Sequence, residues 1–113
     1  MNDNTIQLQG NILTSDGWVA GSIGFSDMIT EIKGEAQEQT PASGDYILPG
    51  FIDLHVHGGG GKDIMEAGDA VHVVSRLHAR HGTTSMLATT MTAPAEELEA
   101  ALGEMMQETC PSA

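Results

Sequence analysis

The first part of the chain alternates short apolar stretches with residues that favour turns. The apolar stretches lie at residues 5–8, 12–13, 18–19, 23–25 and 28–32. Residues 10–11 and 15–17 separate the first three of them, so the pattern predicts short strands joined by turns, in a β-meander. Residues 33–45 lose apolar side chains and gain Gly, Glu, Gln, Thr and Pro, and we expect a solvated loop there.

The pattern changes period after the Pro-Gly pair at residues 49–50. Residues 51–57 are a strand candidate that the four glycines at 58–61 bring to an end, and residues 83–91 are apolar and β-branched enough for a second strand. Between them, residues 69–81 are apolar at helical spacing. A second helix opens at Pro94. The order of strand, helix, strand and helix predicts parallel βαβ units.

Each predicted helix carries an apolar stripe that we expect to face a core. Asp69 suits the N-cap of the first helix, and Gly82 suits the position just after its C-terminus. The stripe of the first helix consists of Ala70, Val73, Val74, Leu77 and His81. The stripe of the second helix consists of Leu98, Ala101, Leu102, Met105 and Met106.

Charge and cysteine content narrow the classes of partner. The chain has 113 residues, and 4 Lys and Arg against 16 Asp and Glu leave a net charge of −12 at pH 7. Such an acidic chain is not expected to bind nucleic acid phosphates or an anionic membrane surface. The single cysteine, Cys110, cannot form an internal disulfide, and no stretch resembles a signal peptide or a membrane span. These features favour a cytoplasmic protein.

His55 and His57 are the strongest candidates for chemistry. They are two residues apart on a predicted strand, so both side chains project to one face, and they lie near its C-terminal end. Sites in α/β folds gather at that end of parallel strands. The alternative is that this face of the strand is exposed to solvent and carries polar residues for that reason alone. The position at the C-terminal end of a parallel strand favours a metal site. Asp53 shares the face and is expected to orient a ligating imidazole as a hydrogen-bond acceptor.

Other chemistry-bearing residues give weaker signals. The four glycines with Lys62 and Asp63 fail as a phosphate-binding loop, because Val56 stands where that motif needs Gly and Asp63 stands where it needs Ser or Thr. We expect these glycines to form a flexible turn or to let the backbone approach a site closely. His72, His78 and His81 are expected on a helix surface rather than at a metal. Cys110 has no partner residue nearby in the sequence and is expected to be inert.

Residues 48–58, which read LPGFIDLHVHG, resemble the first barrel strand of the metal-dependent amidohydrolase superfamily, with its Pro-Gly-Phe-Ile-Asp-x-His-x-His signature. Within that superfamily, residues 62–67 and 81–90 look most like the N-acetylglucosamine-6-phosphate deacetylase family. The resemblance implies an α/β protein with a TIM (β/α)8 barrel beside a small β-sandwich. It also implies hydrolysis of the acetamide of an amino-sugar phosphate, giving glucosamine 6-phosphate and acetate.

The resemblance assigns His55 and His57 as first-strand ligands of a divalent metal, zinc or iron. The family's other ligands and its catalytic Asp have no matching position, so no catalytic or further cofactor-binding residue is assigned. A full barrel takes roughly 250 residues, far more than residues 51–113 provide. We therefore expect residues 1–48 to be part of the small β-sandwich and residues 49–113 to be the first two βα units of an incomplete barrel. Alone, the chain is expected to be inactive.

Three alternatives stay open at this point. Residues 49–57 are shared with isoaspartyl dipeptidases, dihydroorotases and hydantoinases, so the chain could be part of such an amidohydrolase. It could instead be a non-catalytic acidic βαβ module that binds a partner through exposed sheet edges. In the deacetylase interpretation, the substrate of the complete enzyme is an amino-sugar phosphate. The expected protein partner is then a second copy of the chain or a complementing C-terminal chain.

Overall fold

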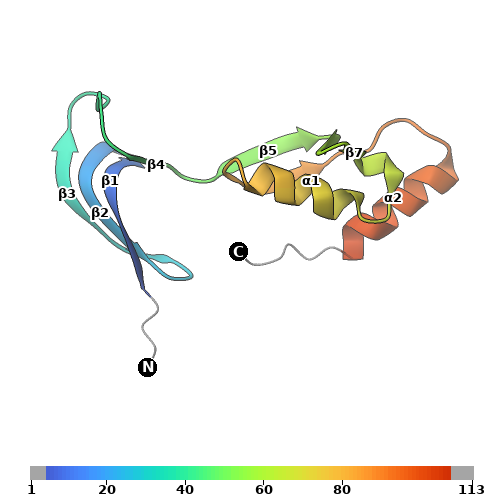
Figure 1. The fold of residues 1–113 in the computed structure, drawn as a ribbon, viewed down its shortest axis with the longest axis horizontal. Helices are drawn as coiled ribbons and strands as arrows, with labels where there is room; N and C mark the ends of the chain where they lie inside the picture. The colour runs from blue at the N-terminus through green and yellow to red at the C-terminus, as the bar shows by residue number, and fades with distance from the viewer. Residues whose placement is uncertain (1–4, 108–113) are drawn as a thin grey trace. The chain divides into compact units, whose positions relative to one another are not determined.

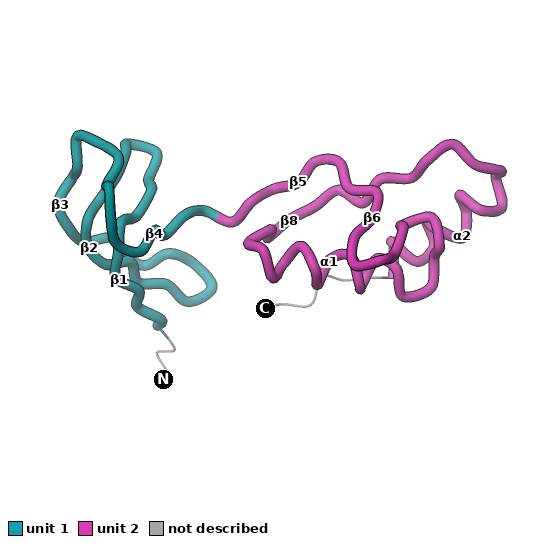
Figure 2. The backbone as a smooth tube through the Cα atoms, turned by 45° about the horizontal axis from the view of Figure 1, so that its top comes forward, with its two compact units in different colours: residues 1–49 teal, residues 50–113 magenta. Residues whose placement is uncertain are grey.

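The computed structural model describes residues 5–107 and divides the chain into two compact units, Met1–Pro49 (unit 1) and Gly50–Ala113 (unit 2) (Figures 1 and 2). In the described residues, unit 1 is built from strands, whereas unit 2 combines strands with helices. The chain is therefore of the α/β class, as the alternation of periods predicts.

Unit 1 is a four-stranded sheet. Its strands are β1 (Ile6–Thr14), β2 (Gly17–Phe25), β3 (Ile29–Gln37) and β4 (Tyr46–Ile47), in the order β3-β2-β1-β4 (Figure 1). The first three pair antiparallel, and β4 pairs parallel to β1. The expected meander is confirmed, with one further strand on its edge.

Two expectations for unit 1 were wrong. Strand β1 continues through Gly10 and Asn11 instead of breaking there, because Gly10 pairs with Gly21 and the Asn11 side chain donates to backbone oxygens of residues 43 and 45. Strand β3 continues to Gln37, into the segment expected to be a loop. This strand lies at the sheet edge, where polar side chains stay hydrated while the backbone pairs with β2.

The apolar face of unit 1 is only partly covered. Ile12 and Ile23 are buried, with 2% and 7% of their surface exposed. Around them lies a hollow of about 350 Å³. Much of its lining comes from five isoleucines: Ile12, Ile23, Ile29, Ile32 and Ile47. Of these, Ile29 is 62% exposed, so unit 1 keeps a substantial apolar surface open.

Unit 2 has the predicted βαβ order. Its elements are β5 (Phe51–Val56), β6 (Gly58–Gly59), β7 (Lys62–Asp63), the 3-10 helix η1 (Ile64–Glu66), α1 (Ala70–Ala79), β8 (Thr83–Ala88) and α2 (Ala95–Gln107). Strands β5 and β8 pair in parallel and lie side by side (Figure 2). Strand β8 ends at Ala88, three residues before the predicted end, and both helices lie within or close to their predicted ranges.

The core of unit 2 lies between the sheet and the helices. Its buried cluster is Val56, Ile64, Val71 and Val74, with Met86, Ala88 and Met105 packed against it. The predicted stripes are only partly right. His81 is exposed because it lies beyond the end of α1. Val71, which was not predicted to belong to the stripe, is buried. In α2, Ala101 is buried but Leu102 and Met106 are 49% and 86% exposed.

The glycine run forms a tight hairpin between β6 and β7. Gly60 and Gly61 have φ values of 65° and 80°, a left-handed conformation that favours glycine at both positions. Asp63 then begins η1 with a capping box. Its side chain accepts from the Met65 amide at 2.8 Å, and the Glu66 carboxylate accepts from the Asp63 amide at 2.9 Å.

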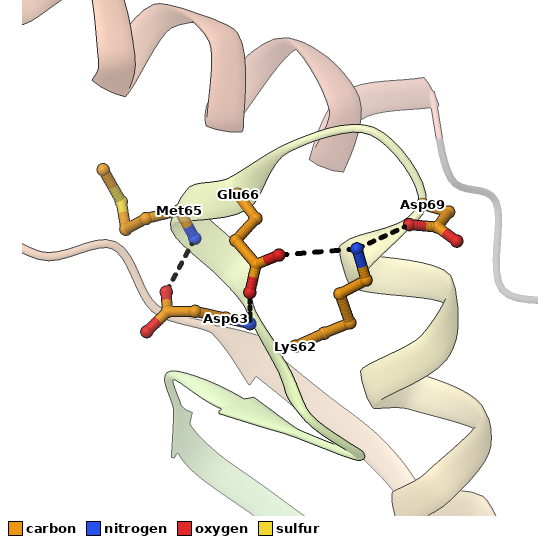
Figure 3. A network of polar contacts seen from close by, with 5 residues as sticks. All are labelled: Lys62, Asp63, Met65, Glu66 and Asp69. Atoms are coloured by element: carbon orange, nitrogen blue, oxygen red, sulfur yellow. Dashed lines mark hydrogen bonds and ion pairs between the residues drawn. The ribbon is translucent and has the colours of Figure 1, made fainter.

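Lys62 links this capping box to the start of α1 (Figure 3). Its ammonium lies 3.4 Å from a carboxylate oxygen of Glu66 and 3.4 Å from one of Asp69. Asp69 is the N-cap residue, as predicted, but its side chain makes no capping hydrogen bond. The hydrogen bonds to Glu66 and then Asp69, with their negative charges, raise the pKa of Lys62.

Candidate metal centre

The candidate site lies where β5 and β8 end. Val56, the last residue of β5, pairs with Ala88, the last residue of β8, so the C-terminal ends of two parallel strands meet here. His55 and His57 flank Val56 in sequence. Val56 belongs to the core, so the period of two places both imidazoles on the opposite face of the sheet. The predicted convergence of the two histidines is thus present.

The two imidazole rings face each other at hydrogen-bond distance. Their Nε2 atoms are 2.8 Å apart, and the ring planes cross at 80° with centroids separated by 4.6 Å. His55 is exposed and His57 is half-buried. One nitrogen of such a pair must carry a proton and the other must offer a lone pair.

The surroundings of His57 identify which nitrogen is the acceptor. Its Nδ1 lies 3.0 Å from the backbone carbonyl oxygen of Thr89, which can only accept. Nδ1 of His57 therefore carries the ring proton, and its Nε2 holds the lone pair that faces His55. A histidine that binds a metal through Nε2 needs this same tautomer.

Asp53 does not have the role expected from its position. Its carboxylate accepts from the backbone amide of His55 at 3.1 Å, so it braces the main chain of β5. The acceptor for a ring nitrogen is instead the carbonyl oxygen of Thr89. Sequence reasoning missed Thr89 because a backbone carbonyl is present at every residue and carries no signature of its own.

The other histidines lie outside this pair. The Nε2 atom of His78 is 3.3 Å from the carbonyl oxygen of Gly58, below the glycine hairpin. His81 is exposed after α1, and His72 lies within α1. Cys110 lies outside the described residues. Across residues 5–107, no group of three or more His, Cys, Asp or Glu is arranged to hold a metal ion.

The donor set therefore fits a divalent ion in part. Imidazole nitrogens are ligands that zinc and iron accept, and the Nε2 atoms of His55 and His57 converge at the end of the strand. In this hydrogen bond His55 carries the proton on Nε2, so that proton would have to leave Nε2 before both rings could hold one ion. A protein site for zinc usually has at least three protein ligands, and the described residues offer two. Further ligands would have to come from water or from groups beyond the described part of the chain.

Among the described residues, neither helix has the length and apolar character needed to cross a membrane. No protein-family model matches the chain.

Comparison with known proteins finds relatives of one enzymatic type. The N-acetylglucosamine-6-phosphate deacetylase of Lysinibacillus sphaericus is 38% identical over 85 residues, which are 74% of this chain and 20% of that protein. The N-acetylgalactosamine-6-phosphate deacetylase of Escherichia coli O157:H7 is 37% identical over 101 residues, 85% of this chain and 26% of that protein.

A solved structure shows the same likeness. The crystal structure of N-acetyl-D-glucosamine-6-phosphate deacetylase from Mycobacterium smegmatis matches 91% of this chain and 31% of its own, with a TM-score of 0.69 and 26% identity. The resemblance to N-acetylglucosamine-6-phosphate deacetylases is thus confirmed. The chain spans 20% and 26% of the length of the two curated relatives described above.

Proposed function

We propose that the chain supplies the first two metal ligands of an amidohydrolase that removes the acetyl group from an amino-sugar phosphate. The observation that carries this proposal is the His55–His57 pair, with its Nε2 atoms 2.8 Å apart at the end of β5. The relatives described above act, by name, on N-acetylglucosamine 6-phosphate or N-acetylgalactosamine 6-phosphate. They favour this reaction over the hydrolysis of isoaspartyl peptides or cyclic amides.

The fold is consistent with the proposal. In our interpretation, β5, α1, β8 and α2 are the first two βα units of a TIM barrel, and the sheet of unit 1 is part of a small β-sandwich. Within residues 50–107, each of the two parallel strands pairs with the other alone, so both outer edges of this sheet are free to pair with further strands. Exposed Ile52 and Leu54, at 67% and 69%, are apolar surface that neighbouring elements of a barrel would cover.

In this account, His55 and His57 hold a zinc or iron ion. When bound, such an ion lowers the pKa of a coordinated water and polarises the amide carbonyl. The chain's own contribution is to bring the Nε2 atoms of two imidazoles together, with the ring of His57 held by the carbonyl oxygen of Thr89. Because the described residues provide two ligands rather than three, we expect the isolated 113-residue chain to have little or no deacetylase activity.

A chimaera tests the proposal. The chain would replace its matched segment in the Lysinibacillus sphaericus deacetylase, and release of acetate from N-acetylglucosamine 6-phosphate would be measured. We expect the chimaera to be active, and the same chimaera with His55→Ala and His57→Ala to fall to background. The matched control is His81→Ala, which removes an exposed imidazole outside the pair.

The chimaera also separates the alternatives. Activity on N-acetylgalactosamine 6-phosphate alone would keep the reaction and change the sugar. A folded chimaera that hydrolyses neither sugar phosphate, or a double-histidine variant as active as its parent, would contradict the proposal. Binding of a partner protein by such an inactive chimaera would favour the non-catalytic interaction module.

A further inference from the structure

Thr89 follows β8 directly and contacts the end of β5 through three of its polar groups. Its backbone amide donates to the carbonyl oxygen of Val56 at 2.7 Å, which continues the parallel pairing of the strands. Its hydroxyl and its carbonyl oxygen make the other contacts. Thr89 is half-buried, so water competes only partly for these hydrogen bonds.

The hydroxyl of Thr89 bridges the two strands. It accepts from the Val56 amide at 3.1 Å and donates to the carbonyl oxygen of Leu87 at 3.0 Å. The register that places Val56 opposite Ala88 brings this amide and this carbonyl to the same point of the ladder. The side chain of Thr89 thus holds its own backbone in a fixed position against β5.

The carbonyl oxygen of Thr89 is then aimed at the ring of His57. It accepts from Nδ1 at 3.0 Å. The backbone of His57 is fixed independently, because its carbonyl oxygen accepts from the amide of Ile64 at 2.8 Å and Ile64 is fully buried. With the main chain held there, the remaining freedom of His57 is rotation of its ring, and the Thr89 contact restricts that rotation.

We infer that Thr89 is a positioning residue for the metal centre: its hydroxyl bridge locks its carbonyl oxygen so that His57 keeps the Nδ1–H tautomer and presents Nε2 beside His55. The metal-binding part of this inference rests on the proposed function. The tautomer part does not, because it concerns the chain without metal. The ring proton and the free lone pair are both needed for a histidine to ligate through Nε2.

Three variants of the full chain test the inference. Thr89→Val removes the hydroxyl while keeping the branched shape, Thr89→Ser restores a hydroxyl, and Thr90→Val makes the same change one residue later, outside these contacts. The tautomer of His57 would be read from the ¹⁵N shifts of the metal-free chain at an alkaline pH where imidazole is neutral. Zinc affinity would be measured by competition with a chelating dye.

We expect the wild-type chain and the Thr90→Val and Thr89→Ser variants to show Nδ1–H at His57. Thr89→Val should lose the preference for this tautomer and bind zinc about tenfold more weakly. Thr89→Val with unchanged tautomer and zinc affinity would overturn the inference, as would Nε2–H in the wild-type chain, which needs no variant to fold. A wild-type chain with the Nδ1–H tautomer that fails to bind zinc would instead contradict the proposed function.

Discussion

Units 1 and 2 are held together by different means. In the described part of unit 1, two apolar side chains are buried, Ile12 and Ile23, and the long strands β1, β2 and β3 pair along most of their length. Unit 2 has shorter strands, but six apolar residues are buried in its described part. These are Val56, Ile64, Ala70, Val71, Val74 and Ala101. Unit 1 therefore depends mainly on its backbone ladder and unit 2 mainly on side-chain packing.

This difference places the candidate chemistry in the better-packed unit. His55 lies in β5 and His57 follows it directly, and the opposite face of this strand carries the buried Val56. A site on a strand that is fixed by a core holds its side chains more accurately than a site on a loop. Unit 1 offers an apolar hollow instead, with few polar groups directed into it.

The two units can be followed separately in one experiment. Trp18, the single tryptophan of the chain, lies in β2 and stacks edge-on against Tyr46 at 5.6 Å between ring centroids. Its fluorescence reports on unit 1. Among the described residues, α-helix occurs in unit 2 alone, so the helical circular dichroism signal reports on unit 2.

The largest loss of folding stability is expected from Ile64→Ala in the core of unit 2. Ile64 is 0% exposed, and its removal should lower the free energy of unfolding by about 3 kcal/mol. Urea unfolding followed by circular dichroism would measure the change. The matched control is Ile52→Ala, in which the side chain is 67% exposed and the expected loss is below about 0.5 kcal/mol. Equal losses in the two variants would contradict the packing described for unit 2.

The second-largest loss of folding stability is expected from Gly21→Ala, in the paired strands of unit 1. A Cβ at Gly21 would overlap the carbonyl oxygen of Lys33 and the Cα of Gly34 on the neighbouring strand. Relieving that overlap should cost about 1–3 kcal/mol and should appear in the Trp18 fluorescence transition. The control is Gly103→Ala in α2, where the new methyl group meets open space.

The Gly103→Ala control should have the opposite sign. Alanine favours the helix over glycine, so α2 should gain up to about 1 kcal/mol. A destabilised Gly103→Ala, or a Gly21→Ala with an unchanged fluorescence transition, would show that the two glycines do not differ as their surroundings indicate.

The smallest effect is expected from Lys62→Met, which removes the link between η1 and α1. Folding raises the pKa of Lys62, chiefly through its hydrogen bond to Glu66 and then through Asp69. The charged form is therefore favoured in the folded chain, so its stabilisation is present at neutral pH and disappears as the pH rises through that pKa. The melting temperatures of the wild type and Lys62→Met should converge in strong alkali. A difference that grows with pH would contradict this assignment.

Much of unit 2 was predictable because its hydrophobic period changes at each boundary. Unit 1 was less predictable. Gly10 and Asn11 suggest a break locally, but pairing with β2 and the hydrogen bonds of the Asn11 side chain keep the strand continuous. Residues 33–37 are polar, and only the neighbouring strand makes them part of the sheet.

The candidate site likewise has a part that the sequence predicts and a part that it does not. The pairing of His55 with His57 follows from a period of two, which the residue types display directly. The support from Thr89 depends on how β8 ends beside β5, and no residue pattern encodes that. Asp53 was assigned to a ring nitrogen because it shares the face, yet a nearer partner, the backbone amide of His55, takes its carboxylate.

Equilibrium dialysis of the purified chain against zinc, with metal analysis of the protein, tests the central claim most directly. The account predicts that the wild-type chain and His81→Ala bind about one ion per chain, whereas His55→Ala and His57→Ala each lose most of the bound zinc. Equal zinc content in all four proteins, or none in the wild type, would contradict the assignment of His55 and His57 as a metal-binding pair.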